Sequence, residues 1–452
     1  MSTLHIVIVG AGIAGLAAAI SISQKAKHDI LICESNPTLT TTGAGIHITS
    51  SASRLLCNWG LREKFEDIAT VPDYMDVRRY GDDRLIGLVP SNIRGHAERV
   101  WGFPHWLVHR IDYRKILADA ATAEGVKIQF GQKVVAIDAE EGRPTLEDGK
   151  ILTADLIIGA DGIHSRTRRS LSAVKDVVPH RASCYCYRAL IPRERMLSNP
   201  LTAALMTNEN QLTWMGPFKH IVAYPVAAGS LYNITIVISD DSDAPIGLYD
   251  EPGDVMQMRN DIKDWNEAVT TMLDMIDSCA KWTIADLPPL PTWTSPNGRV
   301  ILLGDACHAM APHAASGAAT GVEDAEILGH FLVQCKDVRD LARAARSYQD
   351  LRQGRCERIQ EVSRQNANTF SIPDGPEQQA RDRMLQYGKE ALEEQLAEDI
   401  PWTIPQPDAT KPFPHPDFLM WLCGYDAAKE AKTQLRMNRI NPVAGTEVRL
   451  AT

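Results

Sequence analysis

The sequence predicts an α/β fold, and three stretches of the chain support that prediction. An apolar strand at residues 5–9 leads through the turn GAGIAG into an apolar helix over about residues 12–27, the order in which α/β nucleotide-binding units begin. Residues 181–239 are rich in β-branched and aromatic side chains, which favour strands. Residues 317–370 have a helical pattern of apolar positions, with a break near residue 336. We therefore expect a Rossmann-like domain, an interleaved sheet-rich lobe and C-terminal helices.

The other elements follow from hydrophobic periodicity. In the first half we expect strands at 29–34, 134–138, 145–146 and 155–159, and a helix at 114–124. In the second half we expect a hairpin with its turn at 227–230, helix over 254–279 and a strand from residue 300. The tail from Pro373 is polar and Pro-rich in places, although "PDFLMWLCGYD" is too apolar for a free linker.

The composition is that of a globular protein and excludes some partners. The chain has 452 residues, a formal net charge of -10 and 44% hydrophobic residues. Because no block of Lys or Arg is present, nucleic acid and anionic membranes are poor candidates, and no apolar run reaches the roughly 20 residues of a membrane span. The N-terminus leaves no room for a signal peptide, and the nine cysteines are scattered, so we expect reduced thiols and a cytoplasmic protein.

The first chemical motif is the glycine-rich turn between the first strand and helix. Gly10 permits the tight turn, Gly12 lets the backbone approach a pyrophosphate, and Gly15 lets helix and strand pack closely. The first helical N–H groups, near Ile13 and Ala14, are then directed at the phosphates. This arrangement predicts a bound dinucleotide.

An acidic residue narrows the choice of dinucleotide. Glu34 ends the second strand, 19 residues after Gly15, where it can accept hydrogen bonds from an adenosine ribose. It would repel a 2′-phosphate, so the motif predicts FAD or NAD rather than NADP.

The second motif is "DLIIGADGIHSRTRRSL", residues 155–171. A buried strand delivers Asp161 and Gly162 to a loop, and Ser165 is a candidate N-cap of the next helix. Taken alone, this pattern is equally typical of any strand–turn–helix unit.

The third motif is "VILLGDACHAMAPHAASGAATGVEDA", residues 300–325. Cys307 and His308 are adjacent and project differently, and Asp305, His308 and His313 match no familiar ligand spacing. We therefore predict neither a metal site nor a catalytic thiol. Instead, Asp305 should end a strand that faces the ligand, and the following small residues should start a helix against which a large planar cofactor lies.

Together, the three motifs resemble those of the single-component, FAD-dependent aromatic hydroxylases, over roughly residues 5–370. Within that family, "GAGIHI" at 43–48, "YRALI" at 187–191, "HIVAYP" at 220–225 and "QNANTF" at 365–370 look most like salicylate hydroxylases and 6-hydroxynicotinate 3-monooxygenase. Such enzymes bind FAD through one Rossmann-like domain and bind NAD(P)H transiently, which fits a chain with a single GxGxxG.

The resemblance implies a domain organisation and a set of FAD contacts. The FAD-binding domain should comprise residues 1–175 and 291–372, the sheet-rich substrate lobe 176–290, and a helical or irregular extension 373–452. The implied contacts are Glu34 with the adenosine ribose, Arg110 with the phosphate and ribose region, Asp161 near both FAD and NAD(P)H, Asp305 with the ribityl chain or pyrophosphate, and the backbone at Ala44-Gly45 and Gly317-Ala318 against the isoalloxazine.

The resemblance also implies a reaction. NAD(P)H reduces FAD, O2 forms a C4a-hydroperoxyflavin, and a small aromatic substrate, a phenolic acid or hydroxypyridine, is hydroxylated with or without decarboxylation. The ring must be activated as a phenolate, for which His47, Arg188 and Tyr224 are the candidate catalytic residues. The protein would be a monomer or a homodimer.

Three other functions stay open at this point. A flavin-dependent halogenase shares the fold but normally carries WxWxIP, where the nearest text here is "KWTIADLPP". Epoxidation or hydroxylation of an indole or polyketide ring in secondary metabolism uses the same flavin chemistry. The third is a non-catalytic regulatory protein that binds FAD or NAD.

Overall fold

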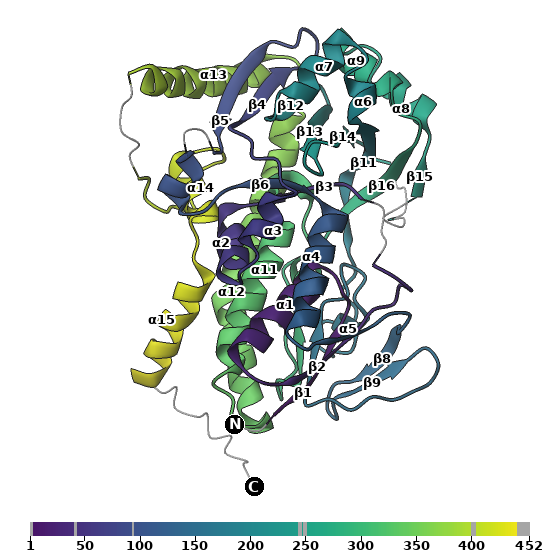
Figure 1. The fold of residues 1–452 in the computed structure, drawn as a ribbon, viewed down its shortest axis with the longest axis vertical. Helices are drawn as coiled ribbons and strands as arrows, with labels where there is room; N and C mark the ends of the chain where they lie inside the picture. The colour runs from purple at the N-terminus through teal and green to yellow at the C-terminus, as the bar shows by residue number, and fades with distance from the viewer. Residues whose placement is uncertain are drawn as a thin grey trace.

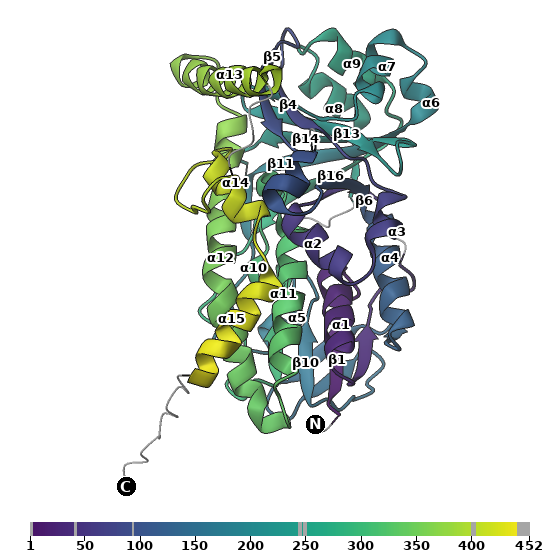
Figure 2. The ribbon, with the colours of Figure 1, turned by 60° about the vertical axis from the view of Figure 1, so that its left-hand side comes forward.

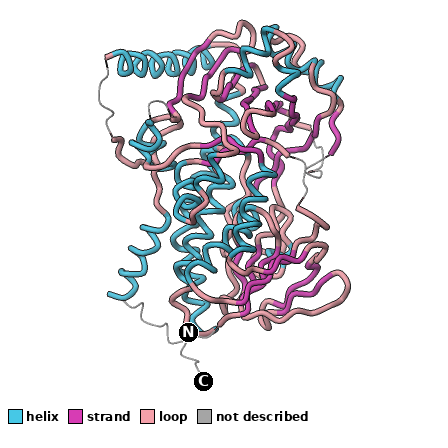
Figure 3. The backbone as a smooth tube through the Cα atoms, in the orientation of Figure 1, coloured by secondary structure: helices cyan, strands magenta, loops and turns pink. Residues whose placement is uncertain are grey.

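The computed structural model describes residues 3–39, 43–92, 95–242, 246, 251–398 and 404–440, and these form two lobes (Figure 1). The strands gather in one group in each lobe, and long helices run beside and between them (Figure 3). The lobe that contains the N-terminus is built on a five-stranded sheet, and the other lobe on an eight-stranded sheet.

The five-stranded sheet has the order β17-β10-β1-β2-β7, with every neighbouring pair parallel. Its strands are β1 (His5–Val9), β2 (Asp29–Cys33), β7 (Lys127–Gln129), β10 (Leu156–Gly159) and β17 (Val300–Leu302). The apolar runs at 5–9, 29–34 and 155–159 are confirmed as strands, and their continuous hydrophobicity fits parallel strands that are covered on both faces.

Helices α1 (Ile13–Lys25), α4 (Arg110–Ala123) and α11 (Gly317–Leu332) pack together in this lobe. Small residues let α1 and α11 approach closely, since a Cβ built on Gly329 would lie 2.5 Å from Oγ of Ser21. The lobe also contains the hairpin β8 (Val134–Asp138) and β9 (Arg143–Leu146), with α5 (Arg166–Arg169), α10 (Asp305–His308) and the short helices η3 (Pro312–Ala314) and η4 (Val338–Asp340).

The eight-stranded sheet has the order β15-β16-β11-β14-β13-β12-β4-β5, and all its pairs are antiparallel except β12 with β4. Its strands are β4 (Tyr74–Arg79), β5 (Leu85–Pro90), β11 (His180–Pro192), β12 (Gln211–Gly216), β13 (Lys219–Val226), β14 (Leu231–Ser239), β15 (Glu251–Gly253) and β16 (Cys279–Asp286). Helices α6 (Arg193–Met196), α7 (Pro200–Thr207), α8 (Val255–Asp261) and α9 (Glu267–Asp274) lie over its far side (Figure 1).

The period-two pattern of β13 gives this sheet two different faces. Ile221 and Ala223 point into the hydrophobic core beneath the helices, whereas His220, Val222 and Tyr224 line a cavity on the opposite face. The hairpin turn predicted at 227–230 is confirmed by a hydrogen bond from the N–H of Ser230 to the carbonyl of Ala227.

Three boundaries differ from the sequence predictions. Strands β4 and β5, from the segment assigned to the first domain, complete the eight-stranded sheet, so residue 176 is not where that sheet begins. The helix predicted over 254–279 is two helices, because the chain turns at 262–266. The helix predicted at 114–124 begins four residues earlier, at Arg110, directly after a strand.

A two-stranded ribbon, β3 (Gly45–Ile48) with β6 (Trp106–His109), lies between the lobes (Figure 1). Helices α2 (Ser50–Asn58), α3 (Arg62–Glu66) and η2 (Ala97–Trp101) lie between its two strands in the sequence, and α2 packs against the other two. The long helix α12 (Leu341–Phe370) extends from the first lobe to the second (Figure 2), and the residue after it, Ser371, accepts a hydrogen bond from the N–H of Phe218.

The described part of the C-terminal extension contains α13 (Pro376–Ala397), α14 (Pro416–Cys423) and α15 (Ala427–Ile440), whereas residues 399–403 and 441–452 lie outside the described residues. Helix α13 covers β5, where a Cβ on Gly87 would lie 3.0 Å from Cβ of Leu385. None of the helices in the described ranges is long and apolar enough to cross a membrane.

A buried arginine ties this extension to the rest of the protein. The guanidinium of Arg355 donates to both carboxylate oxygens of Glu323 at 2.9 Å and to the carbonyls of Trp421 and Leu422 at 3.0 and 2.9 Å. It also lies 3.9 Å from the ring centroid of Tyr425. One side chain therefore joins α12, α11 and α14.

We expect Arg355→Met to destabilise the protein and loosen the C-terminal extension. The substitution removes a buried charge from Glu323 and leaves two carbonyls without their donor, which should cost about 3 kcal/mol. Urea unfolding would measure the free energy, and limited proteolysis would detect cleavage near α14. Arg343→Met is the matched control, because Arg343 is 71% exposed in its pair with Asp340 and should contribute less than about 1 kcal/mol. Equal free energies of unfolding for the two variants would contradict the structural role given to Arg355.

Candidate active site

A cavity of about 400 Å³ lies where the two lobes meet. Its walls come from the N-terminal ends of α1 and α11, from β3, and from the inner face of β11, β13 and β14. The sequence-predicted residues that line it are Gly12, Ile13, Ala14, Gly45, His47, Arg110, Arg188, Tyr224, Asp305, Gly317 and Ala318. Those that are not part of its lining are Gly10, Gly15, Glu34, Ala44 and Asp161.

Two of the non-lining glycines shape the turn from behind. Gly10 has φ +103°, and a Cβ there would lie 2.5 Å from the carbonyl oxygen of Ala160. A Cβ on Gly15 would lie 2.2 Å from the carbonyl oxygen of Gly10. Any side chain at either position would push β1, β10 and α1 apart.

Glu34 supports the same turn through its carboxylate. It is buried, and it accepts the N–H of Ala11 at 2.8 Å and that of Asn36 at 2.9 Å. Arg114, which the sequence analysis did not single out, donates to the carbonyl of Ala11 at 2.9 Å and lies 3.8 Å from Glu34. Contact of Glu34 with a ribose stays a prediction.

Helices α1 and α11 begin at the cavity wall. The first N–H groups of a helix have no carbonyl partner within that helix. In the described residues, no side chain caps the N-terminus of α1 at Gly12 or of α11 at Ser316. Both helix ends therefore present backbone donors and partial positive charge to the cavity.

Small residues bring these two helix ends together. Gly304 has φ +61°, and a Cβ there would lie 2.8 Å from Cβ of Ala14. A Cβ on Gly321 would lie 2.9 Å from the same atom. The small residues of the third motif thus serve close packing of α1, α10 and α11 as well as access to a ligand.

Asp305 is the first residue of α10 rather than the end of a strand, and its side chain is open to the cavity. The surrounding protein desolvates the carboxylate and raises the pKa of Asp305, which His308 and Arg110 partly oppose. Arg110 begins α4, and its N–H donates to the carbonyl of Ala44 at 2.9 Å. Ala44 therefore positions the cavity wall without lining it.

A fully buried network fixes the segment that carries Asp305. Oδ2 of Asp324 accepts the N–H of Gly304 at 3.1 Å and lies 2.6 Å from Nε2 of His308, while its Oδ1 accepts from Arg352 at 2.7 Å. Burial alone would raise the pKa of Asp324, but the charges of His308 and Arg352 lower it to about 2. The carboxylate is thus ionised and fully paired.

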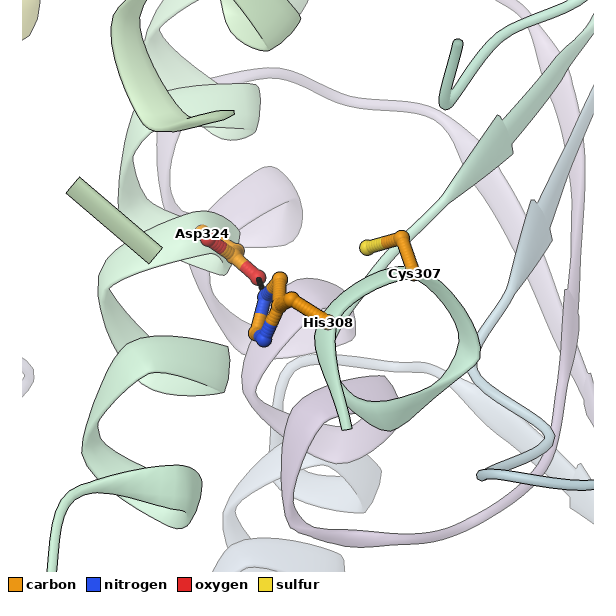
Figure 4. A group of neighbouring side chains, drawn as sticks. All are labelled: Cys307, His308 and Asp324. Atoms are coloured by element: carbon orange, nitrogen blue, oxygen red, sulfur yellow. Dashed lines mark hydrogen bonds and ion pairs between the residues drawn. The ribbon is translucent and has the colours of Figure 1, made fainter. Parts of the chain in front are cut away.

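Cys307, His308 and Asp324 bring three potential metal-ligand atoms within 4.8 Å of one another (Figure 4). Figure 4 shows the His308 ring directed at Asp324, whose oxygens already hold Gly304 and Arg352. The thiol of Cys307 donates to the carbonyl of Gly304 at 3.3 Å, and burial raises its pKa to about 12. These contacts favour a structural role for the cluster, as an ionised thiolate is what a metal or a substrate requires.

The three candidate catalytic residues come from three strands and meet at the other end of the cavity. The rings of His47 and Tyr224 have centroids 5.1 Å apart at an interplanar angle of 84°. Arg188 lines the same cavity, 4.4 Å from the ring centroid of Trp282, and its charge acts on Tyr224. The resemblance named all three as candidates for activating one substrate, and their roles stay predictions.

Burial keeps two of these groups uncharged. Desolvation, together with nearby His105, lowers the pKa of His47 well below its usual value. Desolvation raises the pKa of Tyr224, with Arg188 acting in the opposite direction. At neutral pH the site therefore contains a neutral imidazole and a neutral phenol beside a guanidinium.

Comparison with known proteins decides the family. A family model described as "FAD binding domain" matches residues 3–181 and 269–361. A protein of Beauveria bassiana named FAD-dependent monooxygenase OpS4 is 30% identical over 443 residues, 97% of this chain and 98% of its own length. This chain belongs to the FAD-dependent monooxygenases.

Two further similarities agree with the resemblance seen in the sequence. The 6-hydroxynicotinate 3-monooxygenase of Bordetella bronchiseptica is 29% identical over 82% of this monooxygenase and 94% of its own length. A solved structure of a salicylate hydroxylase substrate complex superposes with a TM-score of 0.74 and 25% identity, covering 96% of this chain and 98% of that one.

The cavity of the monooxygenase fits FAD. The backbone donors at the start of α1 suit its pyrophosphate, and the small residues at the start of α11 suit a flat ring system. Asp305 supplies a hydrogen-bond acceptor to this cavity, and Arg110 supplies a positive charge. These residues would hold the cofactor, with Glu34 and Arg114 supporting the turn from behind.

Asp161, in the second motif, bonds the backbone of the helix that follows it rather than lining the cavity. Its carboxylate accepts the N–H groups of Arg166 and Thr167 at 2.8 and 3.0 Å and so caps α5. Ser165 is confirmed as the N-cap, since it accepts the N–H of Arg168 at 2.9 Å. A role for Asp161 toward FAD or NAD(P)H stays a prediction.

Three histidines that line the cavity were not among the predicted site residues: His105, His220 and His313, the last of which the sequence had suggested only as a rejected metal ligand. His220 bonds Oγ of Ser371 through Nδ1 at 3.0 Å, and its ring centroid lies 5.2 Å from that of His313. Period-two alternation could have found His220, which shares a strand face with Tyr224. No pattern in the sequence indicates His105, which lies in a loop.

We expect Gly304→Ala to weaken FAD binding at least tenfold. The backbone at Gly304 has a positive φ that strains alanine, and the added Cβ would collide with Ala14 at the start of α1. Fluorescence titration of the apoprotein with FAD would measure the Kd. Gly354→Ala in α12 is the matched control, because nothing lies within 4 Å of the added Cβ. An unchanged Kd in Gly304→Ala would contradict this account of the helix junction.

Proposed function

We propose that this monooxygenase uses NAD(P)H and O2 to hydroxylate a small phenolic acid or hydroxypyridine, with or without loss of the carboxyl group. The observation that carries the proposal is the meeting of Arg188, Tyr224 and His47 at one end of the cavity, away from the Gly12 turn. The names of the relatives, a hydroxynicotinate monooxygenase and a salicylate hydroxylase, support it.

Bound FAD supplies the activated oxygen, and the residues of this chain prepare the ring. The guanidinium of Arg188 pairs with a carboxylate or phenolate of the substrate. Tyr224 keeps its proton, so its hydroxyl donates a hydrogen bond to the ring oxygen. His47 is neutral and takes the proton of the substrate hydroxyl, which makes the ring electron-rich.

The nicotinamide cofactor visits the FAD domain rather than a domain of its own. The sequence carries one GxGxxG turn, at Gly10–Gly15, and that turn serves FAD. We propose transient NAD(P)H binding, a monomeric or homodimeric enzyme, and a cytoplasmic location, which suits nine cysteines that are all unpaired.

A second candidate, oxidation of an indole or polyketide ring, is favoured by the apolar part of the cavity. Met75, Val89, Phe370, Phe413 and Leu419 line it, and such walls suit a ring system larger than a single phenol. The same flavin chemistry would act on either substrate, so the substrate itself must be tested.

We expect salicylate or 6-hydroxynicotinate to accelerate NAD(P)H oxidation and to give a product with one oxygen atom from 18O2. Each acid is compared with its counterpart without the carboxylate, phenol or 2-hydroxypyridine. An arginine–carboxylate bond contributes about 1.5–3 kcal/mol, so the KM of the acid should be roughly 10–100-fold lower. Arg188→Leu should remove that difference.

Two outcomes would contradict the first candidate. If the acids have no advantage in the wild-type enzyme, recognition of the carboxylate by Arg188 is wrong. If indole alone stimulates oxygen incorporation, the second candidate is correct.

We expect Tyr224→Phe and His47→Gln to spare flavin reduction and to damage hydroxylation. Ring deprotonation matters only when oxygen is transferred, so both variants should oxidise NAD(P)H but release more H2O2. Loss of the general base in His47→Gln typically costs 10²–10⁴-fold, about 3–5 kcal/mol of barrier. Raising the pH toward the pKa of the substrate phenol should partly restore product, because solvent then supplies the phenolate. Tyr387→Phe, at a 75% exposed position, is the control, and normal coupling in both site variants would exclude these roles.

A further inference from the structure

His105 lies in direct contact with the candidate base. Its Nε2 is 3.1 Å from Nδ1 of His47, and the two rings are nearly perpendicular, with centroids 5.3 Å apart at 88°. The loop before β6 carries His105 and β3 carries His47, so 58 residues separate them in sequence. Both line the cavity.

The backbone of His105 is held on both sides by one asparagine. The N–H of His105 donates to Oδ1 of Asn92 at 2.9 Å, and Nδ2 of Asn92 donates back to the carbonyl of His105 at 2.8 Å. The same Nδ2 donates to the carbonyl of Pro72 at 2.8 Å. The imidazole of His105 is therefore presented to His47 from a fixed support.

Both imidazoles are neutral at neutral pH. Burial lowers the pKa of His105 to about 4, and burial together with the nearby His105 lowers the pKa of His47 well below its usual value. A hydrogen bond between two neutral imidazoles contains a single proton, carried either by Nδ1 of His47 or by Nε2 of His105. The choice fixes which nitrogen of His47 is an acceptor.

We propose that His105 is a positioning residue that accepts the Nδ1–H of His47 and leaves Nε2 of His47 as the acceptor for the substrate proton. This inference rests on the proposed function. When the substrate hydroxyl O–H bond breaks, its electron pair stays on the ring oxygen and the proton forms an N–H bond at Nε2 of His47. The resulting imidazolium keeps its Nδ1–H on His105, as a catalytic histidine keeps its orienting acceptor.

A neutral acceptor suits this site better than a carboxylate would. A carboxylate beside Nδ1 would raise the pKa of His47, so that the imidazole would be protonated before the substrate arrived. It would also repel an anionic aromatic acid. Among the described residues, the titratable groups that the structure shows against His47 are His105 and Tyr224, and both are uncharged.

The tautomer of His47 can be measured without any substrate. In the FAD-loaded enzyme labelled with ¹⁵N-histidine, long-range ¹H–¹⁵N spectra distinguish a protonated from an unprotonated ring nitrogen, and His47→Gln assigns the signals. We expect His47 to carry its proton on Nδ1 in the wild type and in His105→Gln, whose amide oxygen is a neutral acceptor at similar reach. In His105→Leu the proton should move to Nε2.

Coupling measurements then connect the tautomer to the reaction. His105→Leu should keep its FAD affinity and substrate-stimulated NAD(P)H oxidation but lose at least tenfold in product formed per NAD(P)H, and His105→Gln should recover most of it. His28→Leu, which removes a histidine that accepts the N–H of Leu4 and is not part of the cavity lining, should behave as wild type.

Two results would overturn the proposal. One is an Nε2–H tautomer of His47 in the wild type, and the other is normal coupling in His105→Leu. The tautomer is read in the absence of substrate, so it tests His105 even if phenolic acids prove not to be substrates. If His47 carries its proton on Nδ1 but no aromatic acid is hydroxylated, the proposed function is wrong and the role of His105 stands.

Discussion

The carboxylate of Asp324 is the contact on which the cofactor end of the cavity depends. It joins the loop at Gly304, the ring of His308 and the guanidinium of Arg352, so β17, α10, α11 and α12 meet at one charge. A buried carboxylate is tolerated only when it is paired on every side. Because Asp305 follows Gly304 directly, this pairing also sets where Asp305 stands relative to the helix ends that face FAD.

The neighbouring residue on the same helix, Glu323, extends this constraint to the C-terminal extension. Glu323 pairs with Arg352 at 2.8 Å and with Arg355 at 2.9 Å, and Arg355 holds the carbonyls of Trp421 and Leu422. Leu422 lines the cavity. Two adjacent acids on α11 therefore connect the segment that faces the cofactor with the C-terminal wall, and the buried charges of this lobe serve the shape of the site rather than its chemistry.

Local pattern predicted the parts of this protein that depend on local chemistry. The continuous apolar strands, the turn at Gly10 and the small residues after Asp305 each have a physical requirement visible within a few residues. Strands β4 and β5 were missed because β4 pairs in parallel with β12, 136 positions further on in the register from Met75 to Gln211, and no short window records such a pairing. For the same reason, no short window of sequence indicates His105, whose partner His47 lies on the other strand segment of the β3–β6 ribbon. Arg114 was not predicted either, because its role depends on a contact with Glu34, far away in sequence.

The two ends of the cavity differ in how they handle charge, and the difference suits the proposed reaction. At the cofactor end, the buried carboxylate of Asp324 is paired with His308 and Arg352 whether or not a substrate is present. The substrate end has histidines and a tyrosine that burial keeps neutral, with Arg188 as the cation beside them. A histidine with a lowered pKa is a weak base, so it can take the hydroxyl proton only while Arg188 and Tyr224 stabilise the phenolate. The same weakness makes the imidazolium a ready donor once oxygen has been transferred, so the proton returns and the site regains its neutral state.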